Sequence, residues 1–399
     1  MKIGIIKERK TPSDSRVVFD PSQCKRLVHL GIDLVVESSD VRCFSDEDYR
    51  AQDIKIVSDV SDCDVLLGVK EVPIDALISN KTYFFFSHTI KEQEYNRGLL
   101  QAIIKKNIRL IDYEVLTNDQ GTRVIAFGRF AGMVGAHNAL WTYGQRSSLL
   151  SMSRMKDLYD YQAAQAVYAD INIPPVKIVL TGTGRVANGA AEVLQDMGIQ
   201  KVRPIDYVTT QYDGPVFTQL NSFYYARRKD GEVFDDVRDF YNNPAQYDSD
   251  FHHFLPMSDI MINGIYWDND APAFFTKDQM KTDKFGIKVI ADVTCDIAPV
   301  SSIPSTLRAS TIDDPVFGYD AGLDQEVAAF SANAIDVMSI DNLPNEMPRD
   351  ASTAFGEMFI DHVLPALKNP NDKLLNRATI AHNGVLGDHF DYLSDYIEG

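Results

Sequence analysis

The sequence lacks paired cysteines, long apolar runs and an excess of positive charge. Its four cysteines are scattered with no Cys-x-x-Cys pair, a pattern that disfavours a zinc site and is typical of a reducing compartment. No apolar run approaches the roughly 18 to 20 residues that a membrane-spanning helix needs. The apolar run at the amino terminus is too short for a signal peptide. We therefore expect a cytoplasmic protein with no metal ion in its site.

Basic residues are outnumbered by acidic ones. The chain has 39 Lys and Arg against 57 Asp and Glu, which gives a formal net charge of -18. This balance favours solubility and would repel a nucleic acid backbone or an anionic membrane surface. We expect neither as a partner. An anionic substrate would need a local basic cluster that acts against the overall charge.

The chain of 399 residues is longer than one hydrophobic core usually organises, so two domains are expected. Short apolar runs alternate with segments of helical spacing, which predicts parallel βαβ units. Expected strands cover residues 2–6, 32–36, 65–69, 83–86, 108–111, 124–127, 176–180, 201–205, 260–265 and 288–293. Expected helices cover 21–30, 130–150 and 186–197, with a helical connection over 151–174 and an insertion over 207–255 that is rich in aromatic and charged residues.

A glycine-rich segment lies between an expected strand and an expected helix: Thr181-Gly182-Thr183-Gly184-Arg185-Val186-Ala187. It fits the pattern G-x-G-x-x-G/A, in which glycines let the backbone approach a pyrophosphate at a helix amino terminus. Asp206 ends the next expected strand, about the 20 residues downstream where an acid contacts the ribose. A glycine turn without a ligand is the alternative, and the combined context disfavours it.

The same acid bears on the choice of cofactor. A carboxylate at Asp206 would accept hydrogen bonds from a ribose 2′-hydroxyl and repel a 2′-phosphate. The cofactor is therefore NAD or NADP, and Asp206 favours NAD. Arg185 and Arg203 lie close in sequence and would soften that preference.

Two basic residues stand where expected strands end. Lys70 follows the strand over 65–69, and His88 follows the strand over 83–86. Ligands bind at the carboxyl ends of parallel strands. A lysine beside apolar walls can have its pKa lowered to a useful range, and a histidine already titrates near neutrality. A solvated lysine and a hydrogen-bonded turn histidine are the plainer interpretations, and the pattern alone does not choose.

Other charged residues lie near strand ends or turns. A guanidinium group matches a carboxylate in bidentate geometry, as a dicarboxylate substrate would require. Solvated surface charge, or a helix cap, is the plainer interpretation of each one taken singly. The set consists of Arg16, Lys91, Glu114, Arg123 and Arg129, with Asp292 and Asp296 after the strand that begins at residue 288.

Several longer blocks stand in order along nearly the whole chain. The blocks are residues 81–91 (KTYFFFSHTIK), 109–114 (RLIDYE), 126–128 (AFG), 181–184 (TGTG), 262–267 (INGIYW) and 339–344 (SIDNLP). These blocks resemble the lysine–2-oxoglutarate reductases and lysine-forming saccharopine dehydrogenases, in particular the reductase half of the animal bifunctional aminoadipic semialdehyde synthase. Alanine dehydrogenase is similar more distantly.

The resemblance implies an α/β fold of two Rossmann-like domains with the active site in an interdomain cleft. Residues 1–133 with 338–399 would form the substrate and catalytic domain, and residues 134–337 the dinucleotide-binding domain. The implied enzyme is an NAD(P)-dependent oxidoreductase that reduces the imine of L-lysine and 2-oxoglutarate to saccharopine, or runs in reverse. A homo-oligomer is compatible with this interpretation.

The resemblance also implies roles for residues. It places acid–base catalysis on Lys70 and His88. Substrate binding falls to Arg16, Lys91 and Glu114, to which we add Arg123. Cofactor binding falls to Gly182, Thr183, Gly184, Arg185, Val186, Asp206 and Asp296.

Two departures leave the physiological direction and the downstream partner open. The animal enzyme has a second dehydrogenase half for which this chain has no counterpart. The insertion over 207–255 resembles the animal reductase, which favours saccharopine formation. The alternatives are an alanine dehydrogenase-like reductive amination of a small 2-oxo acid and a dinucleotide-binding sensor without turnover.

Overall fold

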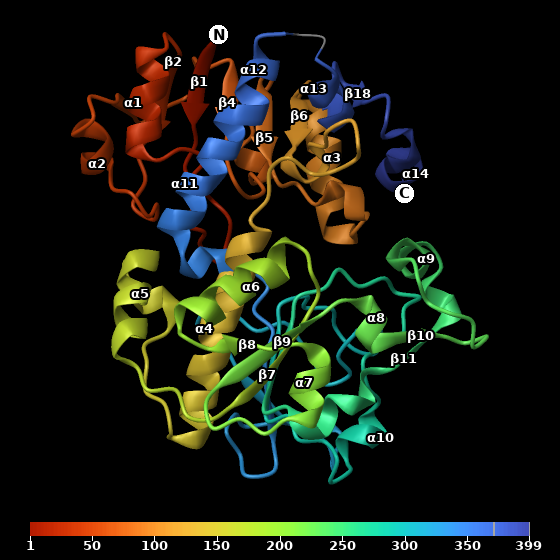
Figure 1. Cartoon of the computed structure of the whole chain (residues 1–399). Helices are drawn as coiled ribbons and strands as arrows, with labels where there is room; N and C mark the ends of the chain where they lie inside the picture. Colours follow the sequence, from red (N-terminus) through yellow and green to blue (C-terminus); the bar gives the residue numbers. More distant parts are fainter. Residues whose placement is uncertain (370–371, 399) are drawn as a thin grey trace. The chain divides into compact units, whose positions relative to one another are not determined.

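The chain divides into two units, Met1–Phe127 with Pro348–Gly399, and Gly128–Met347 (Figure 1). The computed structural model describes residues 1–369 and 372–398. The boundaries fall at the starts of helices α4 (Gly128–Ser147) and α11 (Pro348–Met358), whereas the sequence placed them at 133/134 and 337/338.

The first unit is built on an eight-stranded sheet in the order β18-β17-β6-β5-β4-β1-β2-β3. The strands from β3 to β6 are parallel, and β17 runs antiparallel beside β6. The order 3-2-1-4-5-6 within this sheet is that of a Rossmann fold, whose ligands bind at the carboxyl ends of the strands. The strands are β1 (Lys2–Ile5), β2 (Asp33–Glu37), β3 (Ile56–Val57), β4 (Val65–Leu67), β5 (Thr82–Phe85), β6 (Arg109–Asp112), β17 (Thr379–His382) and β18 (Val385–Leu386).

Segments from both ends of the chain complete this unit. Helix α1 begins with a capping box of Asp20 and Gln23 around Pro21, an arrangement that satisfies the first backbone N–H groups. The ring of Phe359 from the late part of the chain packs edge-on against Phe19 and Phe84. The helices are α1 (Pro21–His29), α2 (Asp46–Arg50), α3 (Glu94–Lys105), α11, the π-helical turn Phe359–Val363, α12 (Leu364–Leu367), α13 (Lys373–Ala378) and α14 (Ser394–Glu398).

The second unit has its own eight-stranded sheet, in the order β15-β14-β16-β13-β12-β7-β9-β8. Strands β8, β9, β7, β12, β13 and β16 are parallel, and β14 and β15 are antiparallel additions at one edge. The strands are β7 (Lys177–Thr181), β8 (Gln200–Lys201), β9 (Val216–Leu220), β12 (Ile260–Asn263), β13 (Val289–Asp292), β14 (Phe317–Asp320), β15 (Gln325–Val327) and β16 (Ile335–Met338).

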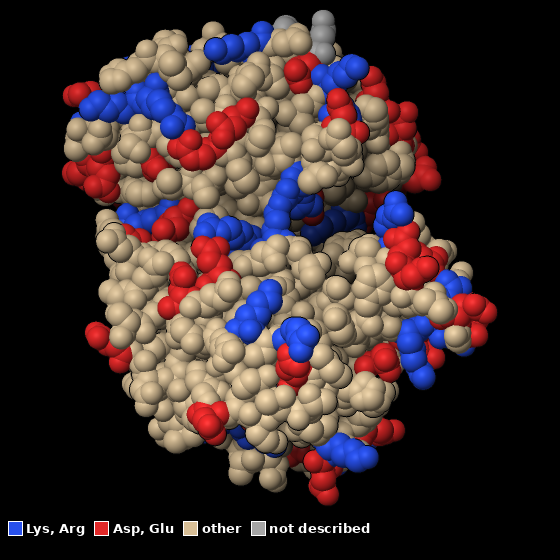
Figure 2. Space-filling model, viewed as in Figure 1, with Lys and Arg blue, Asp and Glu red and all other residues tan. Residues whose placement is uncertain are grey.

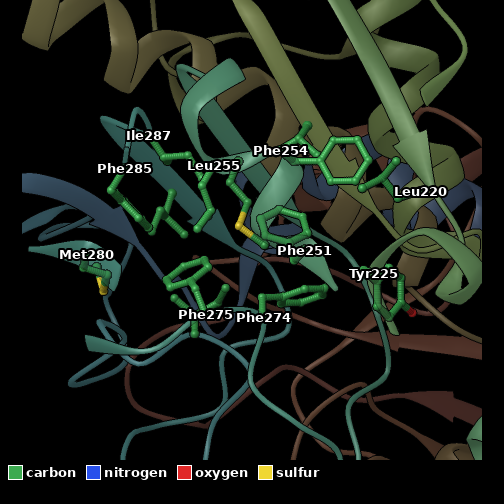
Figure 3. Close-up of a cluster of buried hydrophobic side chains, with 14 of the residues drawn as sticks. Leu220, Tyr225, Phe251, Phe254, Leu255, Phe274, Phe275, Met280, Phe285 and Ile287 are labelled. Carbon is green, nitrogen blue, oxygen red and sulfur yellow. The ribbon is translucent and has the colours of Figure 1, made fainter. Parts of the chain in front are cut away.

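Aromatic side chains build much of the core of the second unit. Phe251, Phe254, Phe274 and Phe275 lie together with Leu220 and other apolar residues (Figure 3). A two-stranded hairpin of β10 (Ala226–Arg228) and β11 (Tyr247–Ser249) lies beside this core. The helices are α4, α5 (Tyr161–Asp170), α6 (Arg185–Asp196), α7 (Pro204–Thr209), α8 (Ser222–Tyr225), α9 (Val237–Asn242) and α10 (Lys277–Met280).

Four of the expected elements differ. Residues 124–127 form no strand, because the local pairing is limited to a bridge between Thr117 and Arg123. The strand expected over 201–205 stops at Lys201, since Pro204 begins helix α7. The connection over 151–174 contains one α-helix, α5, rather than continuous helix. The expected insertion over 207–255 includes β9, which pairs with β7 inside the main sheet.

The expected α/β class with two Rossmann-like domains is confirmed. All four cysteines are free thiols. Across the described ranges, no helix combines the length and apolar character needed to cross a lipid bilayer. On the face drawn in Figure 2, basic side chains stand beside acidic ones at several places, as the many ion pairs of the surface require.

Candidate active site

The carboxyl-terminal edge of the first sheet gathers the predicted acid–base residues. Lys70 follows β4, His88 follows β5 and Glu114 follows β6, while Arg16 lies in the segment after β1. Parallel strands bring their carboxyl ends to one edge, so the sequence-predicted residues of this unit come to the same edge.

Lys70 is a half-buried cation. Burial lowers the pKa of its ammonium group, and the nearby charges of Arg16 and Lys10 lower it further. A lowered pKa makes an ammonium group easier to deprotonate, which favours its use as a general acid and base. The position is therefore chemically suited to acid–base work.

Glu8 holds the strand end that carries Lys70. Its two carboxyl oxygens accept hydrogen bonds from the backbone N–H groups of Val69 at 2.7 Å and Lys70 at 2.8 Å. Burial, followed by the charge of Asp14, raises the pKa of Glu8 to about 8. The neighbouring Gly68 packs against Ile6, because a Cβ there would lie 2.9 Å from Ile6 Cδ1.

His88 is fixed from two sides. Its backbone adopts a left-handed φ of 54°, which is uncommon outside glycine. The preceding Ser87 anchors this turn, because its N–H and hydroxyl both donate to the buried carboxylate of Asp112 at 2.8 and 2.5 Å. The imidazole Nδ1 lies 2.5 Å from Glu71 Oε1, so the ring orientation is set and Nε2 is left for chemistry.

Glu71 is held as a carboxylate. Burial alone would raise its pKa, but the hydrogen bond and charge of His88 and the contact with Lys10 outweigh burial and lower it to about 2. Lys10 Nζ lies 2.9 Å from the second oxygen, Oε2. The order Lys10–Glu71–His88 resembles a base with a partner that orients it.

Arg16 is buried and its guanidinium is oriented by Asp14. The Nε and Nη2 atoms of Arg16 donate to the two oxygens of Asp14 at 3.0 and 2.6 Å. The guanidinium carbon also lies 4.3 Å from the centre of the Phe127 ring. A guanidinium held in this way is a fixed positive charge.

Glu114 carries a buried acceptor that the fold does not use. Its Oε1 lies 3.3 Å from Arg123 Nη2 and 3.8 Å from Lys91 Nζ, so two further predicted residues meet at this carboxylate. Its Oε2 is buried, and no donor in the described ranges reaches it. An unsatisfied buried carboxylate oxygen is costly, and a cationic ligand group would satisfy it.

The second unit carries the glycine-rich loop between β7 and α6, as predicted. Gly182 has a φ of +98°, and a Cβ there would lie 2.7 Å from the carbonyl oxygen of Gly264. Gly184 is the residue before α6, and the space beside it is open. Thr183 and Arg185 are exposed around this opening. A backbone that bares the first N–H groups of a helix in this way fits a pyrophosphate.

Close helix packing stabilises this loop. A Cβ on Gly132 of α4 would lie 1.8 Å from Val186 O, and one on Gly189 of α6 would lie 2.0 Å from Arg129 O. The two helices therefore touch backbone to backbone, which only glycine permits. The crossing fixes the amino terminus of α6 relative to α4.

A buried polar network joins three strand ends of the second sheet. Thr181 Oγ1 donates to Asn263 Oδ1 at 2.8 Å, and Asn263 Nδ2 donates to Asp292 Oδ1 at 2.9 Å. Thr306 donates to the other oxygen of Asp292 at 2.7 Å. Burial raises the pKa of Asp292 to about 6. Asp296 is half-buried in the loop just after this strand.

The placement of Asp206 at a strand end is wrong. Asp206 lies in the first turn of α7 and forms an ion pair with Arg203, with Nε 2.6 Å from Oδ2. Lys177 at the amino end of β7 donates to the carbonyl oxygens of Tyr207 and Thr210, so the last turn of α7 lies by the edge opposite the glycine loop. The strand beside β7 is β9, and it ends at Leu220.

Residues of β9 take the place that Asp206 was expected to occupy. Gln219 Nε2 donates to the carbonyl oxygen of Gly182 at 3.1 Å, and Asn221 follows directly after the strand. A pocket of about 90 Å³ in the same unit is lined by aromatic side chains that include Tyr225, Tyr266 and Trp267. The residues present therefore fit a dinucleotide, with an apolar space for a ring.

Sequence reasoning missed Glu8, Glu71, Asp112 and Asn263. Glu8 and Glu71 follow strand ends, so the rule that selected Lys70 would have found them. Asp112 and Asn263 end their own strands within runs that read as apolar, and only the tertiary structure shows their partners. A separate group of Asp250, His252 and His253 brings potential metal ligands within 4.8 Å of one another on the surface.

The fold and the two edges define a class: a two-domain α/β protein with a Rossmann-like sheet in each unit. A solved L-alanine dehydrogenase aligns over 100% of this chain and 99% of its own length with a TM-score of 0.68 at 17% identity, a likeness of fold alone. Residues 4–134 match the family model described as alanine dehydrogenase/PNT, N-terminal domain.

Relatives found by sequence similarity carry more specific descriptions than the family model does. The α-aminoadipic semialdehyde synthase of Mus musculus is 30% identical over 95% of this chain and 46% of its own length. The saccharopine dehydrogenase [NAD(+), L-lysine-forming] of Yarrowia lipolytica is 26% identical over 91% of this chain and 92% of its length. The chain spans about half the length of the synthases that it matches. Its homologues are thus these synthases and the fungal saccharopine dehydrogenases, which confirms the predicted resemblance.

Proposed function

We propose that this chain is an NAD(P)-dependent oxidoreductase that joins L-lysine and 2-oxoglutarate into saccharopine, or cleaves saccharopine in reverse. The observation that carries the proposal is the acid–base pair at one sheet edge: Lys70 with a lowered pKa and His88 clamped by Glu71. The names of the homologues supply the substrate class.

The reaction needs protons to move at three atoms. The lysine ε-amine must lose a proton before it attacks the ketone, the carbinolamine oxygen must gain one to leave as water, and the product nitrogen exchanges one after reduction. Lys70 is assigned to the amine, because a lysine of lowered pKa accepts a proton there. His88 is assigned to the carbonyl oxygen, with Glu71 holding the ring in its donating orientation.

The remaining charged residues are assigned to binding. Arg16, which Asp14 orients, supplies a fixed positive charge for a substrate carboxylate. Glu114 offers its buried Oε2 to a substrate ammonium group. Lys91 and Arg123 flank that carboxylate and balance its charge.

A bound reduced nicotinamide dinucleotide supplies the hydride. Gly182, Thr183 and Gly184 would hold its pyrophosphate with their backbone, together with Arg185 and Val186 at the start of helix α6. Asp296 is assigned to the nicotinamide side. Asn221 at the end of β9 is assigned to the ribose, in place of Asp206.

The direct test follows the absorbance of NADH, and separately NADPH, with L-lysine and 2-oxoglutarate at neutral pH. We expect oxidation that requires both substrates. Turnover with pyruvate and ammonia, and none with lysine, would instead support the alanine dehydrogenase-like alternative that the fold allows. Tight dinucleotide binding without turnover on any pair would support a sensor.

The assignment of the bases has its own test. Lys70→Met and His88→Ala should each lower kcat/KM by about a hundredfold or more, the usual size of an acid–base contribution. If each variant stays within about threefold of the parent enzyme, less than ~1 kcal/mol of transition-state stabilisation is lost and the assignment fails. Lys105→Met, which removes an exposed charge from α3, is the matched control.

A further inference from the structure

A second polar pocket opens at the other end of the first sheet, away from the edge of Lys70 and His88. It encloses about 550 Å³, a size in the range of small-molecule sites. Its walls come from the amino ends of β5 and β6 and from the hairpin of β17 and β18. The lining residues are Asn80, Lys81, Thr82, Asn107, Arg109, Asn376, Thr379, His382, Asn383, Gly387 and Asp388.

Strand register brings three basic residues to this pocket. Thr82 and Arg109 are partners at the starts of the parallel strands β5 and β6, with Lys81 just before Thr82. Strand β17 runs antiparallel beside β6, so its last residue, His382, comes to the same edge. The hairpin folds closely here because Gly387 has no Cβ, which would otherwise lie 2.0 Å from the carbonyl oxygen of Thr379.

The charge of Arg109 is not neutralised within the fold. The Nε and Nη2 atoms of its half-buried guanidinium donate to one neutral hydroxyl, Thr379 Oγ1, at 3.3 and 3.2 Å. Among residues 1–369 and 372–398, no carboxylate forms an ion pair with Arg109, Lys81 or His382. Asp388, an exposed residue, is the one acid that lines the pocket. Burial lowers the pKa of Arg109, as expected for a cation without a counterion.

Side-chain amides add neutral donors to this basic wall. Asn80, Asn107 and Asn383 have left-handed φ angles of 61°, 53° and 52°, which asparagine tolerates in tight turns. Asn107 Nδ2 donates to Asn80 Oδ1 at 2.8 Å, so these two turns are tied together beside the pocket. Turn formation accounts for the backbone of these residues but not for the unpaired cations next to them.

We propose that this pocket binds a small oxyanion, a carboxylate or phosphate group, between Arg109, Lys81 and His382. A guanidinium presents a planar fork to such a group and a lysine adds a point charge, and both are stronger than neutral donors. In a chain with a net charge of -18, a pocket lined by uncompensated cations is a local exception. The site is separate from the proposed substrate and dinucleotide residues.

The test is isothermal titration of the full chain with sodium phosphate and, separately, sodium succinate, each against sodium chloride of equal ionic strength. The variants are Arg109→Met and Lys81→Met, with Lys105→Met, at an exposed residue of α3, as the charge-matched control. We expect each pocket variant to weaken binding at least tenfold, and the control to stay within twofold of the parent. Binding of phosphate alone identifies a phosphate ligand, and binding of succinate identifies a carboxylate ligand.

Two outcomes would overturn the proposal. One is no binding of either anion beyond chloride. The other is binding that persists unchanged in both pocket variants, because phosphate at the glycine loop or succinate near Arg16 would behave in that way. If Arg109→Met does not fold, the variants Lys81→Met and His382→Gln replace it, and each should weaken anion binding at least tenfold. Reductase turnover is not part of this test, so its failure and that of the proposed function are distinguishable.

Discussion

At the scale of single residues, the contact between Glu71 and His88 gives a direct test of whether Glu71 positions the His88 ring. Glu71→Gln keeps the shape of the side chain but removes the charge that faces His88 Nδ1. Because the ring would lose its orienting partner, we expect kcat to fall by about a hundredfold with little change in KM. Steady-state kinetics measures both. An equal fall in kcat/KM that comes entirely from KM would contradict a positioning role.

The carboxylate of Glu71 should also make the free energy of unfolding depend on pH in the acid range. The folded-state pKa of Glu71 is about 2, below its ordinary value of 4.5, so its stabilising contribution is complete above about pH 4.5. As the pH falls from there towards 2, a contribution on the order of 3 kcal/mol should be lost. Urea unfolding of the parent and of Glu71→Gln between those pH values measures it. If the free energy of unfolding falls equally with pH in both proteins, Glu71 is not the group responsible for the loss of stability.

Cofactor choice belongs to this scale as well. Asp206 lies in α7 with Arg203, whereas Asn221 follows β9 beside the glycine loop. We therefore expect Asp206→Ala to leave the ratio of NADH to NADPH efficiency within about twofold of the parent. Asn221→Asp should shift the ratio towards NADH by about tenfold or more, because a carboxylate repels a 2′-phosphate. Steady-state kinetics of both variants with NADH and NADPH measures this ratio. A change in the ratio for Asp206→Ala but not for Asn221→Asp would show that Asp206 selects the cofactor.

At the scale of elements, the crossing of α4 and α6 fixes the glycine loop. Gly132→Ala would place a Cβ against the carbonyl oxygen of Val186, and Gly189→Ala one against that of Arg129. Neither obstacle is a flexible side chain, so we expect each change to cost about 3 kcal/mol or more and to weaken dinucleotide binding.

A matched glycine in another helix supplies the control. Gly98 lies in α3, and a Cβ there would meet Ile74 Cδ1 at 3.6 Å, an ordinary contact. Gly98→Ala should therefore stabilise the chain by about 0.5–1 kcal/mol, since alanine favours a helix interior. Denaturant unfolding of the three variants measures the contrast. Equal effects at all three positions would argue against a backbone contact between α4 and α6.

At the scale of elements, some helices and strands were predictable from the sequence and others were not. Strand ends and the glycine loop were predictable, because apolar runs and the turn at Gly182 are local signals. The expected position of Asp206 at a strand end is wrong because Pro204, followed by an acid two residues later, is a pattern that starts a helix. The strand expected at 124–127 does not form, because the apolar side chains of Ile125 and Phe127 are buried while the backbone of this segment joins no sheet.

The partners of the site residues could not be predicted from sequence. Glu71 and His88 are 17 residues apart, and Ser87 and Asp112 are 25 apart. Such pairs depend on strand order and on the depth of each side chain, which local patterns do not contain. The same holds for Arg109 and His382, which meet only because β17 pairs with β6.

At the scale of the whole molecule, two units with separate cores predict that thermal unfolding is not two-state. We expect calorimetry to resolve two transitions. A dinucleotide should raise only the transition of the unit with the glycine loop, since a ligand stabilises the part that binds it. Gly132→Ala should lower that transition, and Glu71→Gln above about pH 4.5 should lower the other. A single transition moved by every change would contradict this division.

Strand β17 has a consequence for biosynthesis. The first unit cannot close until Thr379–His382 pairs with β6, whereas the second unit is continuous from Gly128 to Met347. Domains usually fold in the order in which they leave the ribosome. Here residues 128–347 can finish folding while strands β1 to β6 wait for Thr379–His382, which follow later in the chain. A chaperone that shields the nascent chain should therefore be needed at the beginning of the sequence rather than at its centre.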